Sequence, residues 1–126
     1  FKKTLHSLAH DWNKPGGAEE LGRWDQFMAQ QLAYFLDRLS SAQESNGSVL
    51  DNTIVLYGSS NSNTHENRNY PLVLAGGRQL GLQHGRFLTF KEDVPLSNLF
   101  VTMLNRVGVE TESFVVSTGE ITELTV

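Results

Sequence analysis

Two short apolar runs, separated by a long polar segment, dominate the middle of the chain. Residues 53–57 (TIVLY) carry no charge, and Pro71 opens a second run, 72–75 (LVLA), which Gly76 and Gly77 close. An uninterrupted apolar run of this length is typical of a strand covered on both faces. We therefore expect an interior strand at 52–58 and an antiparallel neighbour at 71–75, because no helix lies in the connection.

The connection itself, Ser59 to Tyr70, is polar throughout and contains His65 but no aliphatic residue. A loop of this length between two short strands exceeds the usual connection, and ligand sites of α/β sheets commonly lie at the carboxyl ends of strands. The pattern therefore predicts a binding site in this loop. The alternative is a solvated hairpin loop without a function of its own.

Helical periodicity marks two longer segments and one short one. Apolar residues recur every three to four positions over 18–40 and again over 95–107, where Pro95 and Gly108 suit the two ends. Leu5, Leu8 and Trp12 predict a short helix near the start, before the break at 15–17 (PGG). We also expect a polar loop at 40–48, an edge strand at 86–90 and a last strand within 121–126.

These elements predict one α/β domain over residues 1–126, with helices 18–40 and 95–107 packed on a sheet. A chain of 126 residues is long enough for one core. Because it starts at Phe1 and not at Met, we expect it to be a piece of a longer protein. The expected partner is then the upstream half, or a second copy of the chain, covering an apolar patch or an open strand edge.

Charge and motifs narrow the function. The formal net charge is −4 without a basic stripe, which argues against a nucleic-acid partner, and no apolar run is long enough for a membrane span. The chain has no cysteine and therefore no thiolate ligand or nucleophile. Neither GxGxxG nor GxxxxGK[ST] nor GxSxG occurs. Ser59, Ser60 and Ser62 would need a base, and His65 is the histidine nearest to them in sequence.

Candidate metal ligands lie at the N-terminus and in the polar loop. His6 and His10 are four residues apart and share one face if the segment is helical. Asp11 and Asn61 add oxygen donors, and His65 adds a third imidazole. We predict that the three histidines converge at the end of the strand that finishes at Gly58, with zinc as the first choice among divalent metals. The alternative is that the histidines are exposed surface residues without a ligand.

Several short motifs accompany these histidines: 6–11 (HSLAHD), 50–53 (LDNT), 56–59 (LYGS), 71–77 (PLVLAGG) and 105–109 (NRVGV). Together with 113–119 (SFVVSTG) they resemble the C-terminal part of a group of uncharacterised bacterial proteins named for an HxxSHH motif. The resemblance covers nearly the whole chain. Two positions depart from the motif, because Ala9 replaces its Ser and Asp11 its last His.

That group in turn is similar to the alkaline-phosphatase and sulfatase superfamily, which implies a sheet flanked by helices and Asp and His ligands for divalent metal. Residues 57–61 (YGSSN), His65 and Pro71 follow the superfamily's order of strand, ligand loop and Pro-led strand, with Ser60 in place of the expected Asp. The resemblance places the nucleophile upstream of Phe1, and it is compatible with an exported, periplasmic protein.

Two hypotheses follow. In the first, the protein is a metal-dependent hydrolase of phosphate or sulfate esters, and this chain supplies the C-terminal half of its metal site. In the second, it is a noncatalytic binding or structural relative whose metal site has decayed. Ala9, Asp11 and Ser60 favour the second hypothesis, and the three histidines favour the first.

Overall fold

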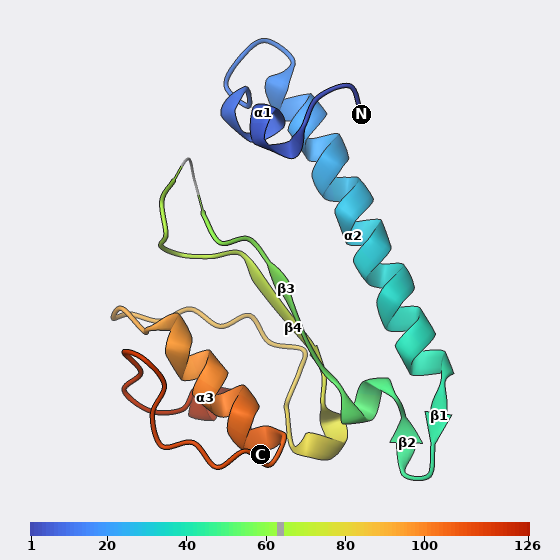
Figure 1. The fold of residues 1–126 in the computed structure, drawn as a ribbon, viewed down its shortest axis with the longest axis vertical. Coiled ribbons are helices and arrows are strands. Elements are labelled where there is room, and N and C mark those ends of the chain that lie inside the picture. Colours follow the sequence, from blue (N-terminus) through green and yellow to red (C-terminus); the bar gives the residue numbers. More distant parts are fainter. Residues whose placement is uncertain (63–64) are drawn as a thin grey trace. The chain divides into compact units, whose positions relative to one another are not determined.

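The computed structural model describes residues 1–62 and 65–126 and has a mixed α/β composition, as predicted. Within these residues there are three α-helices: α1 (Leu5–His10), α2 (Gly17–Ser41) and α3 (Leu96–Arg106). Four short strands form two antiparallel hairpins, β1 (Gln43–Glu44) with β2 (Gly47–Ser48) and β3 (Ile54–Gly58) with β4 (Leu72–Gly76). Figure 1 labels all seven elements. Three short 3-10 helices complete the list: η1 (Leu50–Asn52), η2 (Arg78–Leu80) and η3 (Thr122–Leu124).

The chain divides into two compact units. The first, unit 1, contains Phe1–Leu39 and Tyr57–Val73; the second, unit 2, contains Ser40–Leu56 and Leu74–Val126. In unit 1 the only buried hydrophobic side chain among the described residues is Leu8. The remaining buried hydrophobic residues, Leu82, Leu99, Val101 and Ile121, all belong to unit 2. Unit 2 therefore holds the core, and unit 1 carries the candidate ligands.

The helix ends follow from local sequence. Thr4 caps α1 by accepting a hydrogen bond from the Ser7 N–H. Helix α2 begins at Gly17, and this position requires glycine because a Cβ there would collide with the Asp11 carbonyl. Pro95 stands immediately before α3, and Gly108 follows its end with a φ of 82°, a left-handed conformation that glycine adopts without strain. The predicted helices at 5–12, 18–40 and 95–107 are confirmed, with shifts of a few residues at their ends.

The predicted antiparallel pairing of the two apolar runs is confirmed by the β3–β4 hairpin. The prediction of an interior strand is wrong, because Ile54 to Tyr57 are only half-buried in a two-stranded sheet. Gly76 ends β4 with a φ of 76°, and a Cβ there would collide with the carbonyls of Thr53 and Leu50. The apolar run at 53–57 predicts a strand, but it does not determine how many other strands pair with that strand.

Three other predictions are wrong. Residues 86–90 form no strand, and Phe87, with 92% of its surface exposed, has no sheet to pack on. The last segment forms η3 and a single bridge between Thr125 and Leu82 in place of a strand. Residues 43–48 form the hairpin β1–β2 where a loop was expected. The first two cases concern segments whose pairing depends on distant residues, which local propensity does not determine, and the third is a pairing between close neighbours in sequence.

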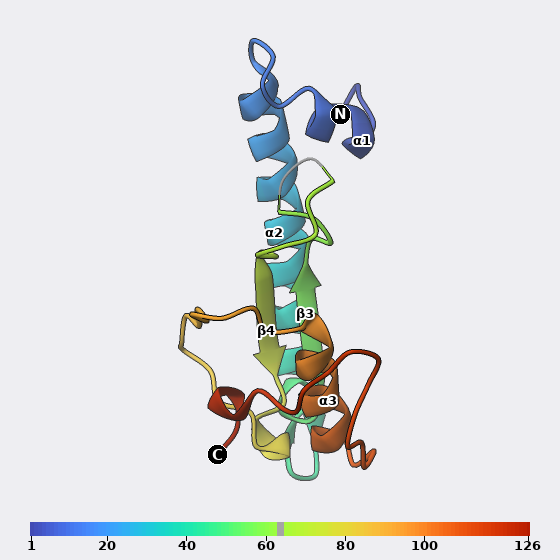
Figure 2. The same cartoon turned by 90° about the vertical axis from the view of Figure 1, so that its left-hand side faces the viewer.

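In unit 2 the chain after α3 folds back beside that helix (Figure 2). A row of polar side chains on α3 holds this tail by hydrogen bonds. The Asn98 side chain bonds the N–H and the hydroxyl of Thr118, at 2.8 and 3.0 Å. The fully buried Thr102 hydroxyl accepts from the Ile121 N–H at 2.8 Å and donates to the Asn98 carbonyl at 2.9 Å. Asn105 exchanges two further bonds with the Thr111 backbone and one with Glu120. The tail thus satisfies its backbone on helix side chains without a sheet.

A second polar centre organises the start of unit 2. The Asp51 carboxylate accepts hydrogen bonds from the N–H and the hydroxyl of Ser48 and an ion pair from Arg78 at 3.0 Å. These hydrogen bonds, with the positive charge of Arg78 adding to them, hold the pKa of Asp51 below its ordinary value. The contacts join β2, η1 and η2.

The buried Thr102 hydroxyl yields the first prediction. Thr102→Val keeps the shape of the side chain but leaves the Ile121 N–H without its acceptor, so the free energy of unfolding should fall by about 1–3 kcal/mol. Chemical denaturation monitored by circular dichroism measures the change. Thr122→Val, at an exposed position, is the matched control and should change stability little. Equal stability of the two variants would contradict the assignment of this bond.

The second prediction uses the lowered pKa of Asp51. A carboxyl group whose pKa is lower in the folded state contributes stability above its unfolded pKa of about 3.9, and that stability is lost as the pH falls through the folded pKa. Asp51→Asn should therefore destabilise the protein at neutral pH and reduce the loss of stability on acidification below about pH 4. Unfolding curves recorded across this pH range measure both effects. A parallel offset at every pH would show that the carboxylate charge contributes nothing.

Candidate metal centre

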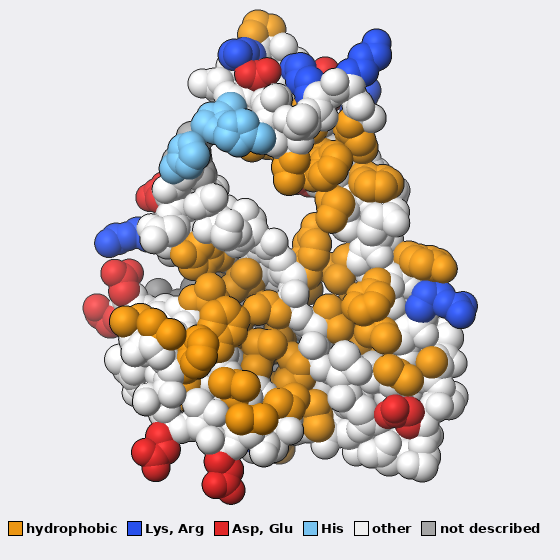
Figure 3. All heavy atoms as spheres, in the orientation of Figure 1, with side chains coloured by type: hydrophobic (Ala, Val, Ile, Leu, Met, Phe, Trp, Pro, Cys, Tyr) orange, Lys and Arg blue, Asp and Glu red, His pale blue; other side chains and the backbone are white. Residues whose placement is uncertain are grey.

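The three predicted histidines lie together in unit 1. The His6 and His10 rings, four residues apart on α1, have centroids 4.4 Å apart, and the His10 and His65 centroids are 5.1 Å apart. All three side chains are exposed, and Figure 3 shows histidine side chains gathered in one patch. His10 is the middle ring of the group. We refer to His6, His10 and His65 as the histidine cluster.

Local structure explains how α1 presents two of these rings. The helix spacing places His6 and His10 one turn apart on the same face, while the buried Leu8 anchors another face of α1. The C-terminal end of α1 carries His10 and is followed at once by Asp11. The helix is short, and its cap at Thr4 fixes where it begins.

His65 comes from the loop between β3 and β4. Its backbone is in the left-handed region, with a φ of 57°, a conformation that histidine adopts more readily than most residues. The loop closes by a hydrogen bond from the Ser62 N–H to the Glu66 carbonyl at 2.9 Å. Residues 63 and 64, just before it, lie outside the described residues. A turn around residue 65 thus brings this ring to the end of the hairpin.

The spacing of the rings suits two ligands of one ion. Zinc binds an imidazole nitrogen at about 2.0–2.1 Å, so two imidazoles on one tetrahedral ion have ring centroids about 5 Å apart. The observed 4.4 and 5.1 Å bracket that value. However, no three His, Asp or Glu side chains within residues 1–62 and 65–126 already stand in an arrangement that could hold a metal ion. Metal binding therefore requires side-chain rotations, which exposed imidazoles permit.

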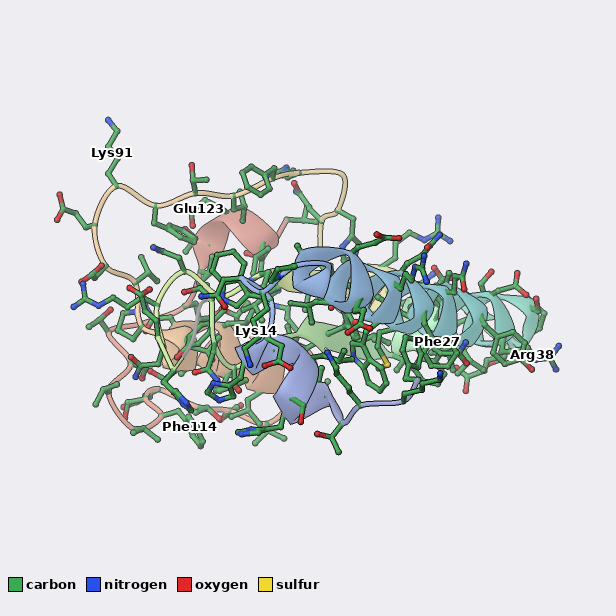
Figure 4. The ribbon with its side chains drawn as sticks, turned by 90° about the horizontal axis from the view of Figure 1, so that it is seen from above. Lys14, Phe27, Arg38, Lys91, Phe114 and Glu123 are labelled. Carbon is green, nitrogen blue, oxygen red and sulfur yellow. The ribbon has the colours of Figure 1, made fainter. Side chains whose placement is uncertain are left out.

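The two predicted oxygen donors differ from the histidines. The Asp11 carboxylate is paired with Lys14 at 2.6 Å and with Lys3 at 3.5 Å (Figure 4 labels Lys14). Asn61 is exposed, and its N–H donates to the Ser59 hydroxyl at 3.2 Å. The Asp11 carboxylate therefore forms ion pairs with two ammonium groups in this structure. The ring contacts within the histidine cluster are between imidazoles alone.

Lys3 and Lys14 were not among the residues predicted for the site from the sequence, although both pair with Asp11. Hydrogen bonding to Lys14, with Lys3 adding to it, holds the pKa of Asp11 below its ordinary value. The pKa of Lys3 is raised, first by its hydrogen bond to Glu20. The spacing of Asp11 and Lys14, three residues apart, was the signal available in the sequence.

The fourth histidine, His84, lies in unit 2 and hydrogen-bonds the Gly76 carbonyl through Nε2. No helix in the described part of the chain is long and apolar enough to cross a membrane.

In comparisons with known proteins, no protein-family model, no curated protein and no solved structure matches this chain.

The ion pairs around Asp11 yield the third prediction. Lys14→Gln removes the larger of the two lysine effects, so the pKa of Asp11 should rise toward its ordinary value of about 3.9. NMR titration of the Asp11 carboxyl carbon measures this pKa directly. Lys2→Gln changes an exposed lysine that is not one of the two paired with Asp11, and it should leave the titration nearly unchanged. An unchanged Asp11 titration in Lys14→Gln would contradict the ion pair.

Proposed function

We propose that the protein is a metal-dependent hydrolase of phosphate or sulfate esters, with the histidine cluster as part of its divalent metal site. The observation that carries the proposal is the proximity of three imidazoles from two segments distant in sequence, α1 and the β3–β4 loop. Neutral imidazole is a preferred ligand of zinc and similar ions. The sequence resemblance to the HxxSHH group, and through it to the alkaline-phosphatase superfamily, supplies the ester substrates.

Each histidine has a distinct part in this proposal. His6 and His10 form a two-nitrogen clamp fixed by the helix, and His65 closes it from the loop. A divalent metal bound there would act as a Lewis acid on an ester oxygen and lower the pKa of a bound water. An exposed three-imidazole set leaves room for such a water or for substrate, as catalytic zinc sites require.

A second function has its own support. The Asp11 carboxylate is held by two lysines, and Ala9 and Ser60 stand where the resembling proteins carry Ser and Asp. In a noncatalytic relative, the cluster would bind metal weakly or not at all and would stabilise the contact between α1 and the loop. The two functions differ in metal affinity and in turnover.

Zinc titration provides the fourth prediction. The purified chain should bind zinc, and His65→Ala should weaken binding by about tenfold or more, because one of three nitrogen ligands is lost. His84→Ala, which removes the histidine of unit 2, is the matched control and should bind as the parent does. Isothermal titration and elemental analysis give the affinity and the stoichiometry. Equal binding by His65→Ala and the parent would reject the cluster as the metal site.

Hydrolysis assays separate the two functions. Zinc-dependent release of nitrophenol from nitrophenyl phosphate or sulfate, lost in His65→Ala and kept in His84→Ala, is expected for the hydrolase. Zinc binding without turnover, by the chain and by any longer form of the protein, would favour the noncatalytic relative.

A further inference from the structure

Helix α2 carries a regular pattern beside its partly buried stripe. The half-buried positions are apolar and follow one face: Leu21, Trp24, Met28, Leu32, Leu36 and Leu39. A second row, which shares Trp24 with this face, starts at Glu20 and ends at Arg38. Its successive spacings are four, three, four, three and four residues. We call this row the α2 seam: Glu20, Trp24, Phe27, Gln31, Tyr34 and Arg38.

The spacing of the seam is that of a coiled-coil contact line. Alternation of three and four residues keeps side chains on one line of a helix, and it marks the line along which two helices pack. The seam contains three aromatic residues, of which Phe27 and Tyr34 are 41% and 65% exposed. Exposed aromatic side chains aligned in this way over almost the whole helix mark an interaction surface.

The order of residues within the seam specifies the partner. The spacings are the same from either end, so two copies of α2 running antiparallel bring positions equidistant from the middle of the seam opposite each other. Glu20 then faces the second copy's Arg38, Trp24 faces Tyr34, and Phe27 faces Gln31. Each pair occurs twice in such a two-fold arrangement. The charges complement each other only in the antiparallel direction, because a parallel pair would set Glu20 against Glu20 and Arg38 against Arg38.

The contacts within unit 1 agree with this pairing. Phe1 packs on Trp24 and Phe27, at ring centroid distances of 4.9 and 5.8 Å, and Lys3 pairs with Glu20. The first half of the seam is therefore partly covered. In the second half, Gln31, Tyr34 and Arg38 make no hydrogen bond or ion pair with another described side chain; Arg38 is labelled in Figure 4. Antiparallel pairing places each bare half against the other copy's covered half, where Phe1 adds a third ring.

We propose that the α2 seam binds the α2 seam of a second copy of this chain in an antiparallel, two-fold dimer. The proposal does not depend on the metal site, because the histidines of the cluster are not part of the seam. Charge complementarity selects the second copy over an unrelated apolar partner, which would match the aromatic residues but not Glu20 and Arg38 at the two ends.

Sedimentation velocity of the chain over a concentration series tests the proposal. The parent should dimerise, and Arg38→Glu should raise the dissociation constant by about tenfold, because two ion pairs become two repulsions. The double variant Glu20→Arg with Arg38→Glu should regain most of the affinity. Asp25→Arg, an exposed charge reversal off the seam, is the matched control and should dimerise like the parent.

Each contrary outcome of this series overturns the proposal. A parent chain that stays monomeric at every concentration has no such dimer. Association that Arg38→Glu leaves unchanged uses another surface. If the double variant keeps an intact helix by circular dichroism but does not regain affinity, Glu20 and Arg38 do not pair between the two copies. The argument for a second copy as the partner then fails.

Cross-linking tests the direction of the helices separately. The chain has no cysteine, so single cysteines can be introduced without background. A mixture of Glu20→Cys and Arg38→Cys chains should form the mixed disulfide under mild oxidation, and either chain alone should form little. Preferential linking of Glu20→Cys to itself would show a parallel pair and would overturn the antiparallel dimer. His65→Ala should leave the association unchanged, so the dimer and the metal site can fail independently.

Discussion

Hydrogen bonding of the chain's irregular tail to one face of α3 is the interaction on which unit 2 depends. Asn98, Thr102 and Asn105 lie at helical spacing, and each satisfies backbone or side-chain groups between residues 111 and 121. Because the backbone groups that a tail buries must find partners, this row replaces the sheet that would otherwise pair them. Val101 and Leu99 next to it supply the buried apolar contacts. Helix α3 can therefore bury Asn98 and Thr102 in a small core, because the tail supplies hydrogen-bond partners for both side chains.

Unit 1 has a different basis. It buries Leu8 and little else, and its segments are linked by ion pairs, aromatic contacts and the histidine cluster. Exposed ion pairs contribute little stability individually. Anything that binds only the folded form of unit 1 would stabilise it, by an amount set by the concentration and affinity of the ligand. The proposed metal at the cluster and the proposed second copy at the α2 seam would each act in this way, at different places.

The predicted site shows how far spacing alone can lead. The helical period predicts His6 and His10 on one face, and His65, which was expected to join them from the loop, has its ring centroid 5.1 Å from that of His10. The oxygen donors were chosen by chemistry and by their proximity in sequence. Asp11 has carboxylate chemistry suited to metal, but Lys3 and Lys14 hold it. The stronger of these two partners, Lys14, lies only three residues away in sequence.

The sequence by itself determined the local structure: three helices with their caps, the β3–β4 hairpin and the two-stripe pattern of α2. Periodicity, Pro95 and Gly17 act over a few residues, so their effects can be derived without a fold, whereas the need for glycine at position 76 comes from the carbonyls of Thr53 and Leu50. The tertiary structure alone decided that β3 is half-buried, that 86–90 stays irregular and that the tail bonds to α3. These outcomes depend on which distant segments compete for the same backbone groups, and a strand run such as 53–57 is equally compatible with a two-stranded hairpin and with a wide sheet.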